Sequence, residues 1–242
     1  MMQLVLPLST PPRYTFDNLI VHEGNEGAVT ALRSLLFSPD GVLPHIFLFG
    51  PPGTGKTHLL HAFITEWEQK SAPGTHARII IPQKAEPRFE ELEELAARPD
   101  LMDSLVALAV DDVPRIDREL GSLLLVIFNK LTRMGAALLI ASCESPAHFS
   151  PDDPHLRSRI LSGLVLELTP PEDPVRMLIL DKMARDKNVR IPREVAGYLV
   201  TRKSRNIKEL ERIVDILDRK SLQLKRRITV PLIKLLEEDG LL

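Results

Sequence analysis

Short apolar runs alternate with helical patterns over the first two thirds of the chain. Five runs are almost continuously apolar, at residues 45–49, 77–82, 105–110, 136–142 and 164–168. Between them, apolar residues recur at helical spacing from Leu59 to Trp67 and again over residues 116–135. Continuous apolar runs are typical of parallel strands that helices cover on both faces. The pattern therefore predicts an α/β fold with a five-stranded parallel sheet.

The pattern changes at residues 169–174, where the sequence reads TPPEDP. Beyond this point we find no strand pattern, but two helix starts are recognisable. One is Asp173 before Pro174, and the other is Asn206 with Glu209 three residues later, which resembles a capping box. We therefore expect three segments: a flexible proline-rich tail at 1–12, an α/β domain at 13–171 and a small all-helical domain at 172–242.

Composition narrows the class of protein. With 242 residues, of which 44% are hydrophobic, the chain can bury a core without disulfides or metals. The single cysteine, Cys143, excludes an intramolecular disulfide and favours a reducing compartment. No apolar run approaches the roughly 20 residues that cross a bilayer, so we expect a soluble cytoplasmic protein with no membrane partner. The net charge of −2 argues against a generic polyanion binder.

The strongest chemical signal is the stretch GPPGTGKT at residues 50–57, which lies between a predicted strand and a predicted helix. Glycines at 53 and 55 would let backbone N–H groups turn toward a phosphate, and the helix N-terminus adds partial positive charge. We expect Lys56 to reach the β and γ phosphates and Thr57 to bind Mg²⁺. The alternative is a glycine-rich turn that binds no ligand.

Two acidic residues, Asp111 and Asp112, end the third apolar run. Open α/β sheets bind ligands at the carboxyl ends of their strands. We therefore expect Asp111 to hold Mg²⁺, directly or through water, and Asp112 to polarise an attacking water. The alternative is that these two acids merely terminate a strand.

Several segments together resemble a known family. They are YTFDNLIV (14–21), GPPGTGKTHLLHA (50–62), the strand ending in two aspartates, LRSRI (156–160) and SRNIKELE (204–211). They are similar to the AAA+ core of the bacterial replication initiator DnaA over residues 13 to 240. No helix-turn-helix domain follows in this sequence, and in this respect it resembles the Hda family of regulatory inactivators of DnaA. The resemblance implies a P-loop AAA+ core followed by a small helical lid.

The resemblance also implies the residues of a nucleotide site that holds ADP or ATP with Mg²⁺. The nucleotide-binding residues would be Ile20, Val21, Pro52, Gly53, Thr54, Gly55, Lys56, Thr57 and His58. The metal-binding residues would be Thr57 and Asp111, and the residues that act on the phosphates Asp112, Arg159 and Lys208. For His58 and the nearby His61, metal binding is one alternative and helix packing the other.

Arg159 matches the family's arginine finger, which acts in trans on nucleotide held by a neighbouring subunit, here ATP on DnaA. The alternative is a surface arginine that pairs with Asp152 or Asp153. Lys208 stands where the initiator usually has a γ-phosphate-sensing arginine, and lysine lacks the bidentate fork. Cys143 stands near a polar sensor position. These replacements imply tight Mg-ADP binding and weak intrinsic ATPase activity.

The N-terminal stretch QLVLPL resembles the family's clamp-binding motif, Q-L-x-L-P-L. Its matching residues are Gln3, Leu4, Leu6, Pro7 and Leu8. The implied partner is the DNA sliding clamp, the beta subunit of polymerase III, because an extended peptide can place leucines in an apolar groove. The alternative is a tail that packs on its own domain.

The function implied by the resemblance is negative regulation of DNA replication initiation. Bound to nucleotide and to the sliding clamp, the protein would stimulate ATP hydrolysis by DnaA and so inactivate it. A helicase-loader-like assembly ATPase and a nucleotide-binding scaffold without catalytic output are the alternatives. A homodimer is also open, because AAA+ sites lie between subunits, whereas sequence-specific DNA binding is not expected.

Overall fold

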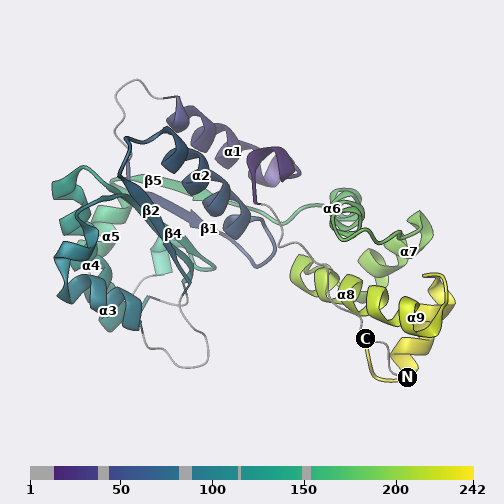
Figure 1. Cartoon of the computed structure of the whole chain (residues 1–242). Coiled ribbons are helices and arrows are strands. Elements are labelled where there is room, and N and C mark those ends of the chain that lie inside the picture. Colours follow the sequence, from purple (N-terminus) through teal and green to yellow (C-terminus); the bar gives the residue numbers. More distant parts are fainter. Residues whose placement is uncertain (1–13, 38–43, 82–88, 114–115, 149–153) are drawn as a thin grey trace, which may run out of the picture. The chain divides into compact units, whose positions relative to one another are not determined.

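The computed structural model describes residues 14–37, 44–81, 89–113, 116–148 and 154–242. They form two compact units, residues 14–170 and residues 171–242 (Figure 1). Each unit has hydrophobic core residues of its own. The motif residues Gln3, Leu4, Leu6, Pro7 and Leu8 lie outside the described residues, as do Asp152 and Asp153. Among the helices of the described ranges, none combines the length and apolar character that crossing a membrane requires.

The first unit is built on a parallel sheet. Its strands are β1 (Ile46–Phe49), β2 (His76–Ile80), β3 (Leu105–Val113), β4 (Ala137–Ser142) and β5 (Leu164–Glu167). They follow the order β2-β3-β4-β1-β5, and every neighbouring pair is parallel. The five-stranded parallel sheet expected from the apolar runs is thereby confirmed.

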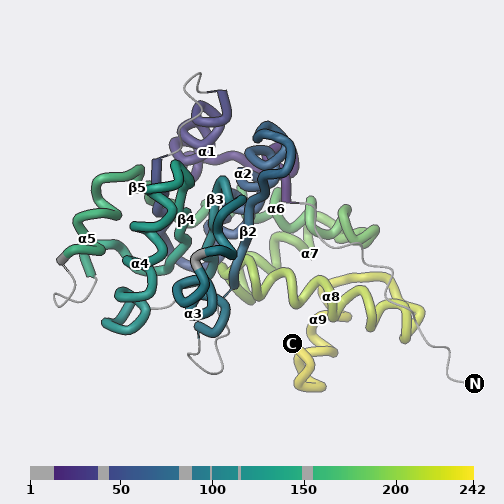
Figure 2. Tube along the Cα trace, turned by 60° about the vertical axis from the view of Figure 1, so that its left-hand side comes forward, coloured from purple at the N-terminus to yellow at the C-terminus, as the bar shows by residue number. Residues whose placement is uncertain are grey.

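Helices cover both faces of this sheet (Figures 1 and 2). They are α1 (Glu23–Leu36), α2 (Lys56–Lys70), α3 (Glu90–Ala97), α4 (Arg118–Met134) and α5 (Pro154–Leu161). Alternate strand residues face opposite layers. In β1, Ile46 and Leu48 pack with α1 and α2, whereas Phe47 packs with α3, α4 and α5. The continuous apolar runs arise because both faces of each strand are buried.

The second unit is helical throughout its described residues, 171–242. Its helices are α6 (Asp173–Asp186), α7 (Arg193–Tyr198), α8 (Ile207–Leu224) and α9 (Val230–Glu238), and a π-helical turn, Leu199–Lys203, extends α7. All four helices contribute to one apolar core. The N-cap of α6 is Glu172, so Asp173 is already the first helical residue and Pro174 the second. The predicted start was thus one residue too late.

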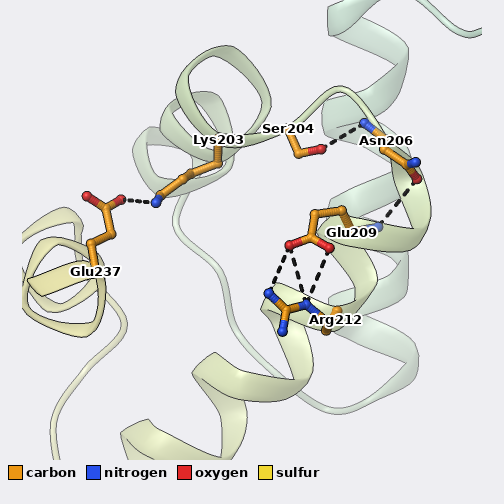
Figure 3. Close-up of polar contacts among 6 residues, drawn as sticks. All are labelled: Lys203, Ser204, Asn206, Glu209, Arg212 and Glu237. Atoms are coloured by element: carbon orange, nitrogen blue, oxygen red, sulfur yellow. Dashed lines mark hydrogen bonds and ion pairs between the residues drawn. The ribbon is translucent and has the colours of Figure 1, made fainter. Parts of the chain in front are cut away.

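The start of α8 contains half of the predicted capping box (Figure 3). The Asn206 side chain accepts hydrogen bonds from the backbone N–H groups of Lys208 and Glu209 at 2.9 and 3.4 Å. The Glu209 carboxylate does not return to the Asn206 N–H but pairs with Arg212 at 3.1 Å. The Ser204 hydroxyl accepts the Asn206 N–H instead, at 3.0 Å. A charged partner one turn along the helix is therefore chosen over the backbone donor.

Candidate nucleotide site

The glycine-rich loop between β1 and α2 has a backbone that only glycine adopts readily. Gly50, Gly53 and Gly55 have φ angles of 148°, 82° and 97°. A Cβ added at Gly50 would lie 2.1 Å from the Leu168 carbonyl oxygen. The Gly50 N–H donates to the Ser142 carbonyl at 3.3 Å. The loop is thus fitted between the ends of β4 and β5, and Gly50 is required by that close approach.

Two side chains of the loop hold its shape. Lys56 is buried, and its Nζ donates to the carbonyl oxygens of Gly50 and Pro51 at 2.6 and 2.9 Å. The buried Thr54 donates its hydroxyl to Pro51 O at 3.0 Å. Pro52 lies exposed in the same loop, and Thr57 follows in the first turn of α2. The cation is held at the loop itself, beside the N-terminus of a 15-residue helix.

The acidic pair lies in an irregular part of β3. Asp111 is buried, and its Oδ1 accepts the Asp112 N–H at 2.8 Å. Asp112 has a φ angle of 52°. The pairing of β3 with β4 shifts register after Val110 and resumes at Val113. The prediction that the strand ends in the two aspartates was therefore wrong: a bulge contains them, and bulges re-aim side chains.

The end of β4 lies between the loop and this bulge, because β4 is the strand between β1 and β3. Ser142 is fully buried; its hydroxyl donates to Val113 O at 3.2 Å and accepts the Glu144 N–H at 3.1 Å. Cys143 is exposed. One carboxylate oxygen of Glu144, Oε2, is buried and has no hydrogen-bond partner among the described residues. The sequence reasoning missed Glu144, although a carboxylate directly after Cys143 was visible.

The segment before α1 approaches the loop as well. A Cβ at Gly55 would have Leu19 Cδ1 as its neighbour, at 3.7 Å. The Ile20 carbonyl accepts from the Asn25 side chain at 3.1 Å, whereas Val21 is 49% exposed. The structure thus places Ile20 and Val21 directly after a residue that neighbours the loop.

The two histidines of α2 contact the start of the first unit. His58 Nε2 lies 2.8 Å from the Thr15 carbonyl oxygen. The Tyr14 ring lies 5.1 Å from the His58 ring and 5.2 Å from the His61 ring. Burial lowers the pKa of His61, and the charge of Asp111 opposes that shift. Within the described ranges, His, Cys, Asp and Glu side chains form no group of three that could hold a metal ion.

The donor set suits a Mg²⁺–nucleotide nevertheless. Mg²⁺ is commonly held by one or two protein oxygens together with phosphate oxygens and water. Thr57 and Asp111 supply such oxygens, and the glycine cradle, which a Cβ at Gly50 would fill, leaves backbone N–H groups near the helix N-terminus. A three-ligand protein cluster is not needed for this kind of binding.

Arg159 lies at the other edge of the sheet. It is exposed on α5, with its guanidinium carbon 5.4 Å from the centre of the Phe128 ring. The His45 ring lies 3.9 Å from the same ring. His45 directly precedes β1, whereas the glycine-rich loop follows it. Because β5 runs parallel to β1, the turn from α5 into β5 lies at this amino-terminal edge, where the Leu164 N–H donates to His45 O at 2.8 Å.

Both ring nitrogens of His45 have partners at this edge. Nδ1 accepts the Leu138 N–H at 2.9 Å, and Nε2 lies 2.9 Å from the Thr132 hydroxyl oxygen. Burial, and secondarily the charge of Arg159, lower the pKa of His45 to about 4. The ring is therefore neutral near pH 7, and the positive charge beside Phe128 belongs to Arg159.

Lys208 belongs to the second unit, at the second position of α8. Nearby, Asp173 of α6 accepts from Arg176 and, at 3.4 Å, from Arg205. Lys203 pairs with Glu237 at 2.8 Å and so ties the π-helical turn to α9 (Figure 3). These ion pairs join α6, the segment before α8 and α9 within the unit.

Comparison with known families accounts for most of the chain. Residues 10–167 match the model of the bacterial DnaA ATPase domain. Residues 173–236 match the model of the Hda lid domain. The two matches divide the chain much as the two compact units do.

Solved structures agree with these matches. Domain III of the Thermotoga maritima replication initiation protein DnaA is 26% identical, with a TM-score of 0.78 over 95% of this chain and 98% of that one. AMPPCP-bound DnaA from Aquifex aeolicus is also 26% identical, with a TM-score of 0.67 over 88% of this chain and 67% of that one. Thermotoga maritima RuvB, a Holliday junction branch migration motor, has a TM-score of 0.69 at 22% identity over 93% and 72%, and shows the fold alone.

Proposed function

Because the chain belongs to the bacterial DnaA ATPase-domain family and is an Hda-type, DnaA-related AAA+ protein, we propose that it inactivates the initiator DnaA by stimulating ATP hydrolysis on it. The match of the second unit to the Hda lid supports this regulatory assignment over that of an initiator. A sliding clamp bound through Gln3, Leu4, Leu6, Pro7 and Leu8 would bring the protein to its target on DNA.

Adenine nucleotide in the protein's own site is the first element of the proposal. The binding of AMPPCP by a DnaA with the same fold supports it. The N–H groups of the glycine-rich loop and Lys56 would hold the phosphates, while Thr57 and Asp111 would hold Mg²⁺, which supplies charge neutralisation. ADP is the expected working nucleotide, since Lys208 lacks the fork of an arginine and Cys143 replaces a better polar group.

The observation that carries the proposal is the position of Arg159. The guanidinium lies at the amino-terminal edge of the sheet, and the chain's own glycine-rich loop lies at the carboxyl-terminal edge. Arg159 therefore cannot serve the nucleotide of its own loop, but it is exposed for another molecule. An arginine supplied in trans stabilises the charge that develops on a transferring γ-phosphate.

The test compares Arg159→Ala with Arg157→Ala, a matched change of an exposed arginine on the same helix. DnaA charged with ATP is mixed with each protein on clamp-loaded DNA, and phosphate release is followed. We expect Arg159→Ala to lose stimulation by about 10³-fold, down to the rate of DnaA alone, and Arg157→Ala to retain it. Normal stimulation by the Arg159→Ala protein would refute the proposal.

A further inference from the structure

Glu144 is a buried acid for which the assignments above leave no role. Its backbone lies two residues beyond the end of β4 and is tied on both sides. Its N–H donates to Ser142 Oγ, which in turn donates to Val113 O beside the acidic bulge. The carbonyl of Ser142 accepts the N–H of Gly50 at 3.3 Å. Glu144 thus follows directly on a residue bonded both to the phosphate loop and to the bulge of β3.

The side chain of Glu144 is incompletely satisfied. Its Oε2 is buried, and no described residue donates a hydrogen bond to it. Leaving a buried acceptor unpaired is costly, and more so for a charged group. An unpaired group of this kind calls for a donor that the folded chain does not itself supply.

The neighbourhood indicates what kind of donor would fit. A nucleotide in the glycine-rich loop brings negative phosphates to this edge, and a bare carboxylate nearby would repel them. Mg²⁺ keeps several of its waters when it binds with phosphates, and these waters donate strongly to carboxylates. The carboxylate would therefore oppose metal-free nucleotide and favour the same nucleotide with Mg²⁺.

We infer that Glu144 accepts a hydrogen bond from water on the Mg²⁺ of bound nucleotide and makes nucleotide affinity depend on Mg²⁺. This inference rests on the proposed nucleotide binding. It provides the site with a carboxylate one residue after Cys143, where the sequence reasoning saw only a loss. Glu144 is accordingly a metal-linked positioning residue of the protein's own site, separate from the action of Arg159 in trans.

The experiment measures the dissociation constant of ADP by calorimetry, once with Mg²⁺ and once with EDTA, for the whole protein. The variants are Glu144→Gln, which keeps the shape and removes the charge, and Glu66→Gln, a matched change of a half-buried glutamate on α2. The ratio of the two dissociation constants should fall about tenfold in Glu144→Gln, with tighter metal-free binding contributing. Glu66→Gln should leave the ratio unchanged.

A second variant, Glu144→Asp, keeps the charge on a shorter side chain and should restore part of the ratio. It also decides the matter if Glu144→Gln does not fold, because a ratio equal to that of the unaltered protein would then overturn the inference. Binding with an unchanged ratio in Glu144→Gln would overturn the role of Glu144 alone. Failure of the unaltered protein to bind ADP with Mg²⁺ would overturn the nucleotide proposal, and this inference with it.

Discussion

The two edges of the parallel sheet in residues 14–170 are built from different chemistry. The carboxyl-terminal edge relies on backbone shape: three glycines at positive φ, a buried lysine and an aspartate in a strand bulge. The amino-terminal edge relies on side chains, with an exposed arginine beside an aromatic ring and a neutral histidine.

This difference follows from what each edge must do. A site that encloses phosphate needs N–H groups aimed inward, and only a constrained backbone provides them. A residue that acts on another molecule needs exposure and a supported direction, which an exposed helix can give. We therefore expect the carboxyl-terminal edge to tolerate substitution poorly and the amino-terminal edge to tolerate it well, each change affecting its own edge.

The largest effect should follow from Gly50→Ala. The new Cβ would meet the Leu168 carbonyl oxygen at 2.1 Å, a contact that forces backbone to move, at a φ angle that alanine rarely adopts. We expect the free energy of unfolding to fall by about 3–5 kcal/mol, measured by urea denaturation. Gly27→Ala is the control, because no atom lies within 4 Å of its Cβ and alanine favours helix. A Gly50→Ala protein as stable as the unaltered one would contradict the proposed rigidity.

A smaller effect should follow from Lys56→Met, which keeps the aliphatic stem and removes the charge. Because charge-assisted hydrogen bonds to phosphate are lost, ADP affinity should fall about 100-fold, or about 2.7 kcal/mol. Lys70→Met, at the far end of the same helix, is the control and should bind normally. The comparison of edges sharpens if Arg159→Ala also binds ADP normally. It breaks if Arg159→Ala weakens ADP binding as much as Lys56→Met does.

Features governed by local chemistry could be predicted from the sequence. The five strands lie within two or three residues of the apolar runs, since both faces of each strand are buried. The positive φ angles of Gly53 and Gly55 agree with what the loop motif requires. The helix of residues 116–135 was predicted because α4 carries its apolar stripe inside one segment.

Features set by contacts between distant segments could not be predicted. The bulge at Asp111 depends on how β3 pairs with β4, which no local pattern of the sequence records. Glu209 pairs with Arg212 rather than with the backbone, a choice between two near-equal partners. The unpaired oxygen of Glu144 depends on burial, which only the folded chain reveals. The position of Arg159 opposite the loop follows from strand direction, not from spacing along the sequence.

The smallest effect concerns the pH dependence of the amino-terminal edge. The pKa of His45 is lowered to about 4 in the folded protein, against about 6.5 in the unfolded chain. Between these values the unfolded chain binds more protons, so stability should fall as the pH drops from about 6.5 to 4 and be fully present above 6.5. Because His45 is partly exposed, we expect the loss to be about 1–2 kcal/mol.

Urea denaturation across that pH range, compared between the unaltered protein and His45→Asn, isolates the contribution of His45 from those of other groups. Asparagine retains an acceptor for the Leu138 N–H but does not titrate, so its stability should fall less steeply. In Arg159→Ala the window should narrow, because the arginine charge is the second cause of the lowered pKa and its removal lets the pKa rise. Identical pH profiles for all three proteins would show that Arg159 and His45 are not electrostatically coupled, and that the amino-terminal edge is supported by packing on Phe128 alone.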